Sequence, residues 1–71
     1  MSCAEVDLLM VKNGRRVGIE FKRADAPRIT PSMRIALRDL RLDALYAVYP
    51  GERRYPLAEA IEAVPLSALL A

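Results

Sequence analysis

The chain has 71 residues, of which 54% are hydrophobic, and its 11 Lys and Arg against 9 Asp and Glu give a formal net charge of +2 at pH 7. One cysteine and no histidine exclude an internal disulfide, a Cys/His zinc site and catalysis through an imidazole, so an active site would have to use carboxylates, lysine, tyrosine or a metal ion. No apolar run approaches the roughly 20 residues of a membrane helix and no signal peptide opens the chain, so we expect a cytoplasmic protein without a membrane partner.

The first element is an antiparallel hairpin over residues 5–22, EVDLLMVKNGRRVGIEFK. Asn13 and Gly14 suit a two-residue type I′ turn, because both of its central positions need a positive φ. With this turn, three apolar pairs face each other across the strands: Val6 with Phe21, Leu8 with Ile19, and Met10 with Val17. Directly paired residues share a face, so the pattern predicts one continuous hydrophobic face.

A helix is predicted over residues 31–41, after a connecting loop. Thr30 suits the N-cap and Pro31 the first helical position. Apolar residues then recur at helical spacing on one face, at Met33, Ala36, Leu37 and Leu40.

Two further strands are expected, at Ala44–Tyr49 and at residues 61–64, followed by a helical turn at Leu66–Leu70. Residues 56–60 fit either a helical turn or a loop. The predicted fold class is α/β, a small β-β-α-β-β unit that forms a single domain over residues 1–71.

Charged residues occupy the second face of the hairpin. The predicted register places Asp7 opposite Glu20 and Glu5 opposite Lys22, so that the four side chains converge. Two facing carboxylates repel each other unless a divalent cation lies between them, and hard cations prefer carboxylate oxygens. This pattern outlines a site for metal-assisted hydrolysis, with the Lys22 ammonium stabilising negative charge.

A simpler interpretation fits the same spacing. Glu5 and Lys22 could form an ordinary cross-strand ion pair, with Asp7 and Glu20 on the solvated side of the hairpin. Leu9 and Val11 share that face with the acids, which favours some cover over part of it.

The acid on one strand and the Glu-x-Lys triplet on the next, EVD followed by GIEFK, resemble the active-site core of the restriction-endonuclease-like PD-(D/E)XK superfamily. From EVDLL to the VYPG that ends the strand Ala44–Tyr49, the chain is similar to the C-terminal region of predicted prokaryotic AAA-type ATPases, catalogued as a domain of unknown function. The resemblance implies metal-binding acids at Asp7 and Glu20, a motif lysine at Lys22 and an auxiliary ligand at Glu5.

The chain also departs from that pattern. The superfamily core normally begins with a helix and a strand before the acid, whereas this sequence starts with MSCA, so a truncated core lacking those elements is expected. No phosphate-binding glycine loop followed by Lys-Ser/Thr occurs, which excludes an ATPase part. A homodimer that covers the exposed sheet edge or face is therefore expected, and an AAA-type ATPase is a candidate partner.

Arginines at helical spacing are candidates for nucleic-acid contacts, at Arg34, Arg38 and Arg41. Contacts to phosphates would give salt-dependent affinity without sequence readout. The alternative is an ordinary solvated helix face, and the nearby Asp39 and Asp43 weaken the positive field.

Two hypotheses about function follow. In the first, the chain is a nuclease-like domain that hydrolyses DNA phosphodiesters with Mg²⁺ or Mn²⁺ held by Asp7 and Glu20. In the second, it is a non-catalytic remnant or interaction module derived from the C-terminal region of an AAA-type ATPase. The sequence leaves both the enzymatic and the non-enzymatic interpretation open.

Overall fold

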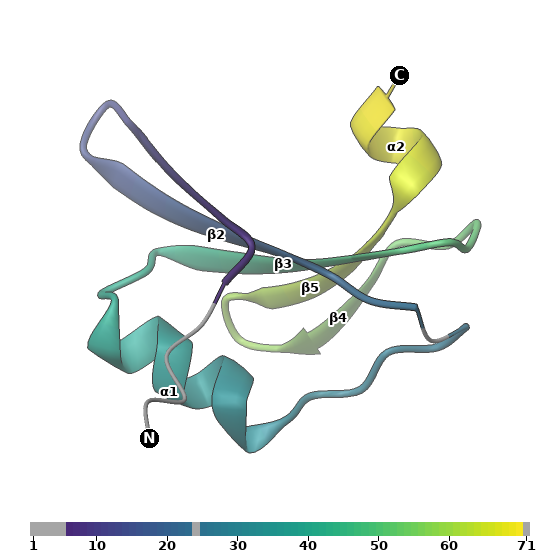
Figure 1. The fold of residues 1–71 in the computed structure, drawn as a ribbon, viewed down its shortest axis with the longest axis horizontal. Coiled ribbons are helices and arrows are strands. Elements are labelled where there is room, and N and C mark those ends of the chain that lie inside the picture. The colour runs from purple at the N-terminus through teal and green to yellow at the C-terminus, as the bar shows by residue number, and fades with distance from the viewer. Residues whose placement is uncertain (1–5, 24, 71) are drawn as a thin grey trace.

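The computed structural model describes residues 6–23 and 25–70 (Figure 1). Over these residues the elements are β1 (Leu8–Lys12), β2 (Arg15–Phe21), α1 (Pro31–Asp39), β3 (Ala44–Tyr49), β4 (Tyr55–Ala58), β5 (Ile61–Pro65) and α2 (Leu66–Leu70). The molecule is a small mixed α/β domain, as predicted. The predicted order omitted one strand, β4.

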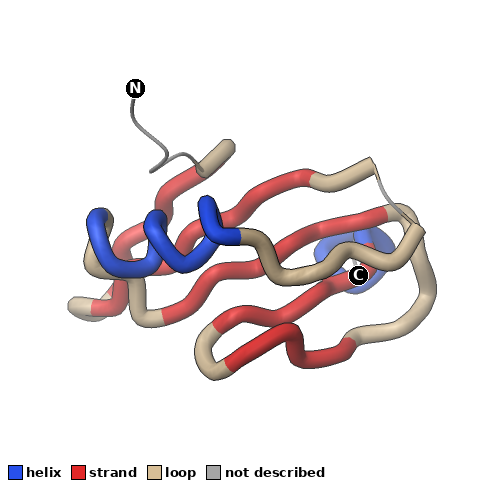
Figure 2. The backbone as a smooth tube through the Cα atoms, turned by 90° about the horizontal axis from the view of Figure 1, so that it is seen from below, coloured by secondary structure: helices blue, strands red, loops and turns tan. Residues whose placement is uncertain are grey.

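All five strands described form one sheet in the order β1-β2-β3-β5-β4. The three central strands, β2, β3 and β5, run parallel, and β1 and β4 pair antiparallel at the two edges. In Figure 2, seen from the α1 side, α1 lies in front of the strands and α2 lies behind them. Neither α1 nor α2, the helices of the described residues, has the length and apolar run that crossing a membrane requires.

The hairpin of β1 and β2 has the predicted turn and register. Asn13 and Gly14 both have positive φ, 52° and 79°. Leu8 pairs with Ile19, and the ladder runs on to the turn in the same register. Because β1 begins at Leu8, the predicted pair of Val6 and Phe21 is not part of the ladder.

The core lies between the sheet and α1. Its buried cluster consists of Met33, Leu42, Leu45, Ala47 and Ile61. The α1 side of β2 carries Gly18 and Glu20, since Gly18 aligns with Leu45 and Glu20 with Ala47. A Cβ at Gly18 would lie 2.8 Å from Leu42 Cδ1, so the absence of a side chain at Gly18 makes room for core side chains.

The hydrophobic face predicted for the hairpin therefore points away from α1. We call this side of the sheet the open face; its apolar side chains are Leu8, Met10, Val17, Ile19, Phe21, Tyr46 and Val48, with Leu66 and Leu69 of α2 at its border. Met10 is 47% exposed and Phe21 is 50% exposed. Strand alternation fixes which residues share a face, but the connection from β2 to β3 decides which face α1 covers.

Helix α1 begins as predicted and ends two residues earlier than expected. The Thr30 hydroxyl accepts a hydrogen bond from the Met33 amide at 3.3 Å, and Pro31 follows the cap. At the other end Arg41 has a φ of 52°, and the Leu42 amide donates to the Leu37 carbonyl at 2.9 Å. This reversal in the left-handed region closes the helix before Arg41.

Strand β4 takes up residues 56–58 of the segment predicted as a helical turn or loop, and residues 59–60 form the turn to β5. The strand pairs with β5 at the sheet edge, with an irregularity in register between Pro56 and Ala58. Proline is tolerated in edge strands because one side of the strand needs no partner. This short, proline-containing segment consequently shows little of the alternation that identifies a strand.

Candidate functional site

Glu20 and Lys22 come together at the end of β2. Residues two apart on a strand point the same way, and Lys22 Nζ lies 3.0 Å from Glu20 Oε1. The Lys22 amide donates to the Val48 carbonyl at 2.7 Å, which holds the backbone against β3 beyond the end of β2. The two side chains are 26% and 20% exposed, so the ion pair is partly shielded from water.

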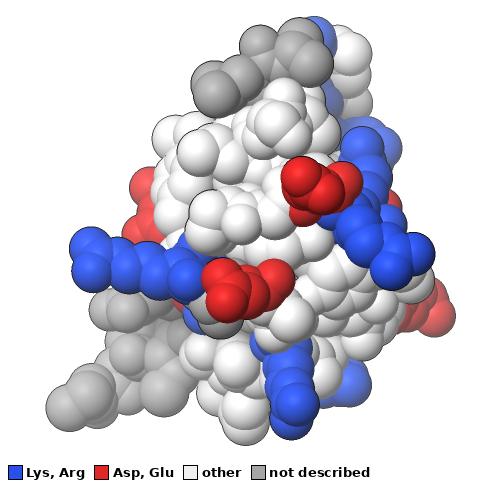
Figure 3. Space-filling model, turned by 90° about the vertical axis from the view of Figure 1, so that its right-hand side faces the viewer, with Lys and Arg blue, Asp and Glu red and all other residues white. Residues whose placement is uncertain are grey.

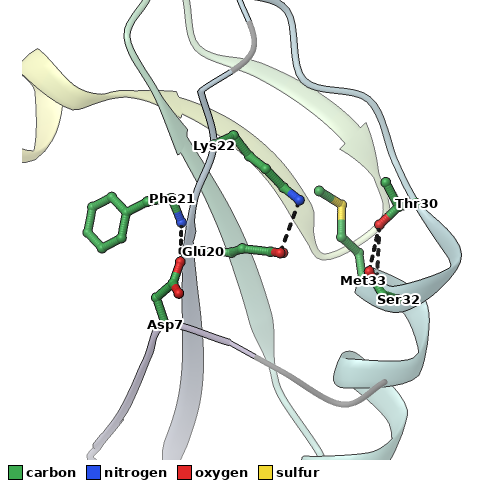
Figure 4. A network of polar contacts seen from close by, with 7 residues as sticks. All are labelled: Asp7, Glu20, Phe21, Lys22, Thr30, Ser32 and Met33. Carbon is green, nitrogen blue, oxygen red and sulfur yellow. Dashed lines mark hydrogen bonds and ion pairs between the residues drawn. The ribbon is translucent and has the colours of Figure 1, made fainter. Parts of the chain in front are cut away.

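The Asp7 carboxylate is held at the neighbouring position of the β2 backbone. Its Oδ2 accepts a hydrogen bond from the Phe21 amide at 2.7 Å, while the Asp7 amide donates to the Ile19 carbonyl at 3.0 Å. The side chain thus takes the place of a main-chain acceptor where the pairing of β1 with β2 stops. Figure 4 shows Glu20 reaching toward Lys22 on the side of Thr30 and Met33, whereas the Phe21 ring lies on the other side of the strand.

Of the four predicted side chains, Glu20 and Lys22 are in contact. The Asp7 carboxylate is bound to the Phe21 amide instead, and in Figure 4 the Glu20 carboxylate extends away from it toward Lys22. Glu5 lies outside the described residues, so its predicted pairing with Lys22 stays a prediction. Among residues 6–23 and 25–70, no group of three or more His, Cys, Asp or Glu side chains gathers in a way that could hold a metal ion.

The donor chemistry of Asp7 and Glu20 still fits Mg²⁺ or Mn²⁺. Magnesium usually keeps several waters and takes one or two protein carboxylates together with substrate phosphates. Over the described residues, the hydrogen bonds to these two side chains engage Asp7 Oδ2 and Glu20 Oε1, which leaves Asp7 Oδ1 and Glu20 Oε2 as ligand atoms.

A hollow next to the ion pair was not foreseen from the sequence. It has a volume of about 300 Å³ and is lined by Lys22, Ala26, Pro27, Arg28 and Thr30. Arg28 brings a second cation to the same hollow as Lys22. A basic residue close behind the motif lysine was the available signal, but only the folded loop shows that the two side chains line one space.

The loop that forms this hollow is anchored to β4. The Tyr55 hydroxyl donates to the Pro27 carbonyl at 2.9 Å. Partial burial of the phenol and, secondly, the nearby Tyr49 raise the pKa of Tyr55 above its ordinary value of 10.0. The phenol of Tyr55 thus has a structural hydrogen bond.

The three candidate arginines for nucleic-acid contacts lie on or just after α1 and are exposed. Arg38 pairs with the adjacent Asp39 at 3.0 Å. Figure 3, which shows another face of the molecule, has acidic groups lying beside basic ones. Positive and negative charges are therefore mixed on that face. On α1 itself, the pair of Arg38 with Asp39 shows the same mixing that the sequence indicated.

The family of the chain is decided by a match over residues 2–69 to a domain of unknown function, DUF4143. The chain belongs to the DUF4143 family. This family is known as a C-terminal domain of AAA-type ATPases, so that part of the resemblance is confirmed. The restriction-endonuclease-like core is not shown by the match.

Two relatives are similar to this DUF4143 chain. They are the uncharacterized proteins Rv2008c of Mycobacterium tuberculosis and Mb2031c of Mycobacterium bovis, each 49% identical over 67 residues. The alignment covers 94% of this chain but only 15% of each relative. No solved structure matches the chain.

Proposed function

We propose that this DUF4143 chain carries a nuclease-like site that hydrolyses DNA phosphodiesters with Mg²⁺ or Mn²⁺, built on a restriction-endonuclease-like core. The observation that supports the proposal best is the 3.0 Å pair of Glu20 and Lys22, together with the Asp7 carboxylate held at the intervening residue by the Phe21 amide. Two carboxylates and one ammonium, from the start of β1 and the end of β2, are the kinds of group that metal-dependent phosphodiester hydrolysis uses.

Each residue has a distinct role in this proposal. Asp7 and Glu20 hold the cation, with Glu5 as an auxiliary ligand, and the Phe21 amide orients Asp7. A bound Mg²⁺ would polarise a phosphoryl oxygen and lower the pKa of a water. Lys22, now paired with Glu20, would stabilise the negative charge that develops on the phosphate.

DNA phosphates would enter from the hollow that Lys22 and Arg28 line. Arg34, Arg38 and Arg41 would add phosphate contacts along α1, with the salt dependence that such contacts bring. Because the family occurs at the C-terminus of AAA-type ATPases, we propose an AAA-type ATPase as partner of this domain. A homodimer through a free edge of the sheet, at β1 or β4, is proposed as well, because an edge strand leaves main-chain groups unpaired.

The second candidate function is a non-catalytic interaction module. The ion pair of Glu20 and Lys22 also favours this function, because each of the two charges is neutralised by the other without a metal ion. The absence of a group of three or more ligand side chains among the described residues points the same way.

Calorimetric titration with MgCl₂ and MnCl₂ tests the metal site. The wild type should bind saturably, and Asp7→Asn and Glu20→Gln should each lose the binding. Glu59→Gln, in the exposed turn between β4 and β5, is the matched control and should bind as the wild type does. Absence of heat in the wild type at millimolar metal would leave the interaction module as the remaining function.

Hydrolysis is tested separately on supercoiled plasmid DNA with Mn²⁺. The wild type should nick the plasmid, whereas Lys22→Met should bind metal normally and leave the plasmid intact. Nicking by Lys22→Met at the wild-type rate would remove Lys22 from the proposed site.

A further inference from the structure

The open face has no layer of structure over it comparable to α1 on the other face. In Figure 1, α1 lies below the sheet, while the tip of the β1–β2 hairpin and α2 both rise on the opposite side. Large apolar side chains between these two walls are exposed, with Leu8 at 47%, Phe21 at 50% and Leu69 at 46%. A chain of this length thus presents a contiguous apolar surface of the kind that marks an interaction site.

The strand directions indicate what kind of element belongs there. The three central strands are parallel, and parallel sheets are found almost exclusively with helices covering both faces. The sequence of β3, ALYAVY, is apolar on both sides, as in strands buried on both faces. The five residues of α2 reach only the border of the open face. Ile19 and Val48 on this face are buried, whereas Leu8 and Met10 of β1 are 47% exposed, so a helical layer is missing over the β1 side.

A hollow on the open face indicates which charge a bound partner should carry. It has a volume of about 410 Å³, lies between the hairpin and α2, and is lined by apolar side chains that include Met10 and Leu69. Lys12 and Arg15 stand at its hairpin end, and neither forms a salt bridge within the part of the chain that the structure describes.

Two acids, Glu62 and Asp43, line a second hollow together with Arg15. Glu62 accepts two hydrogen bonds from Arg54, at 2.9 and 3.1 Å, and this partner raises the pKa of Arg54. Asp43 accepts a hydrogen bond from the Arg16 amide at 2.8 Å. Over the described residues neither acid forms a salt bridge with Lys12 or Arg15, so these two cations give the hairpin end of the hollow a positive border.

We propose that the open face is the docking site of an amphipathic α-helix from a partner protein, whose apolar side packs on the strands and whose acidic border faces Lys12 and Arg15. The binding mode is a helix laid in an apolar groove, with anchors at helical spacing. A second copy of the chain is a poor occupant, because α1 already buries its apolar side chains Met33 and Ala36 in its own core. In the relatives, 85% of the polypeptide lies outside the matched segment, so there the helix can belong to the same chain.

Binding is measured by fluorescence polarisation with a labelled peptide. The probe is a helix-forming peptide of about 18 residues with Leu at one face and Glu along one border. Its control has the same leucines and Lys in place of each Glu. The Glu peptide should bind with an affinity that falls as salt rises, and the Lys peptide should bind about tenfold more weakly or not at all.

Three variants locate the site. Met10→Glu should weaken the binding of the Glu peptide about tenfold or more by placing a charge in the groove. The double variant Lys12→Glu and Arg15→Glu should reverse the preference, so that it binds the Lys peptide better. Arg38→Glu, on the exposed side of α1, is the matched control and should bind as the wild type does.

Each altered residue is exposed, so the variants should fold, which circular dichroism verifies. The proposal is overturned if neither peptide binds, if both bind equally regardless of charge, or if sedimentation shows a dimer that Met10→Glu dissociates. Glu20→Gln should leave peptide binding unchanged, which separates this surface from the proposed metal site.

Discussion

Asp7 combines a structural hydrogen bond with a proposed ligand role, and substitutions can separate the two. Asp7→Ala removes the acceptor of the Phe21 amide and should lower the free energy of unfolding by about 1 kcal/mol. Asp7→Asn keeps an amide oxygen in the same place and should retain most of that stability. Both variants should lose Mg²⁺ binding in calorimetry, because neither supplies a charged oxygen.

Urea unfolding of the two variants beside the wild type gives the comparison. Equal stability of Asp7→Ala and the wild type would show that the bond to Phe21 contributes nothing measurable. Metal binding retained by Asp7→Ala would remove Asp7 from the ligand set while leaving its structural role intact.

The sequence predicted the relative positions of the site residues only where the alternation of side chains along a strand determines them. Glu20 and Lys22 lie two apart, so any strand puts them on one side, and the structure does so. The bond from Phe21 to Asp7 depends on where the β1–β2 ladder stops, which the pattern of residue types does not encode. The contribution of Arg28 depends on the path of a loop, and loops have no period.

At the scale of elements, the start of α1 depends on a side-chain cap. Thr30→Ala removes the hydroxyl that accepts from the Met33 amide and should cost about 1 kcal/mol of unfolding free energy. Thr30→Ser keeps a hydroxyl at the same position and is the matched control. Chemical denaturation should therefore rank the wild type and Thr30→Ser together, above Thr30→Ala.

Strand β4 and the loop before α1 are coupled through Tyr55, which makes stability depend on alkaline pH. The pKa of Tyr55 is raised in the folded state, so folding favours the protonated phenol that donates to Pro27. This contribution is fully present below the unfolded-state pKa of 10.0 and is lost as pH rises through the higher folded-state pKa.

Thermal unfolding of the wild type and Tyr55→Phe across this pH range tests the coupling. The melting temperature of the wild type should exceed that of Tyr55→Phe at neutral pH, and the difference should shrink above pH 10.0. A difference that stays constant through that range would contradict a role for the phenol proton.

Elements with strong local signals were predictable, and those set by their neighbours were not. Asn13 and Gly14 determine the hairpin turn locally, and Thr30 and Pro31 determine the start of α1. Strand β4 exists because β5 offers it an edge, and its own residues do not alternate.

For the molecule as a whole, the two faces of the sheet have opposite energetic roles. The core is built on the α1 face, where Leu45, Ala47 and Ile61 lie under α1 and the side chain of Met33 is fully buried. The open face is equally apolar in sequence, but part of it is exposed to solvent: Ile19 and Val48 are buried, whereas Met10 is 47% and Phe21 is 50% exposed. Composition alone could predict excess apolar surface, whereas assigning it to one face required the position of α1.

Two methionines, one on each side of the sheet, allow the difference in burial to be measured as a difference in stability. Met33 is 0% exposed and Met10 is 47% exposed. Met33→Ala should cost about 2–5 kcal/mol of unfolding free energy, because it leaves a cavity in the core. Met10→Ala should change that free energy by less than about 1 kcal/mol, because much of its side chain is already in water.

Met33→Leu keeps the volume of the core and should cost less than about 1.5 kcal/mol, so the experiment remains informative if Met33→Ala does not fold. The ranking should reverse in peptide binding, where Met10→Ala weakens the interaction and Met33→Leu does not. Equal destabilisation by the two alanine variants would mean that another copy or segment covers the open face in solution, because burial by neighbouring atoms is the source of that cost.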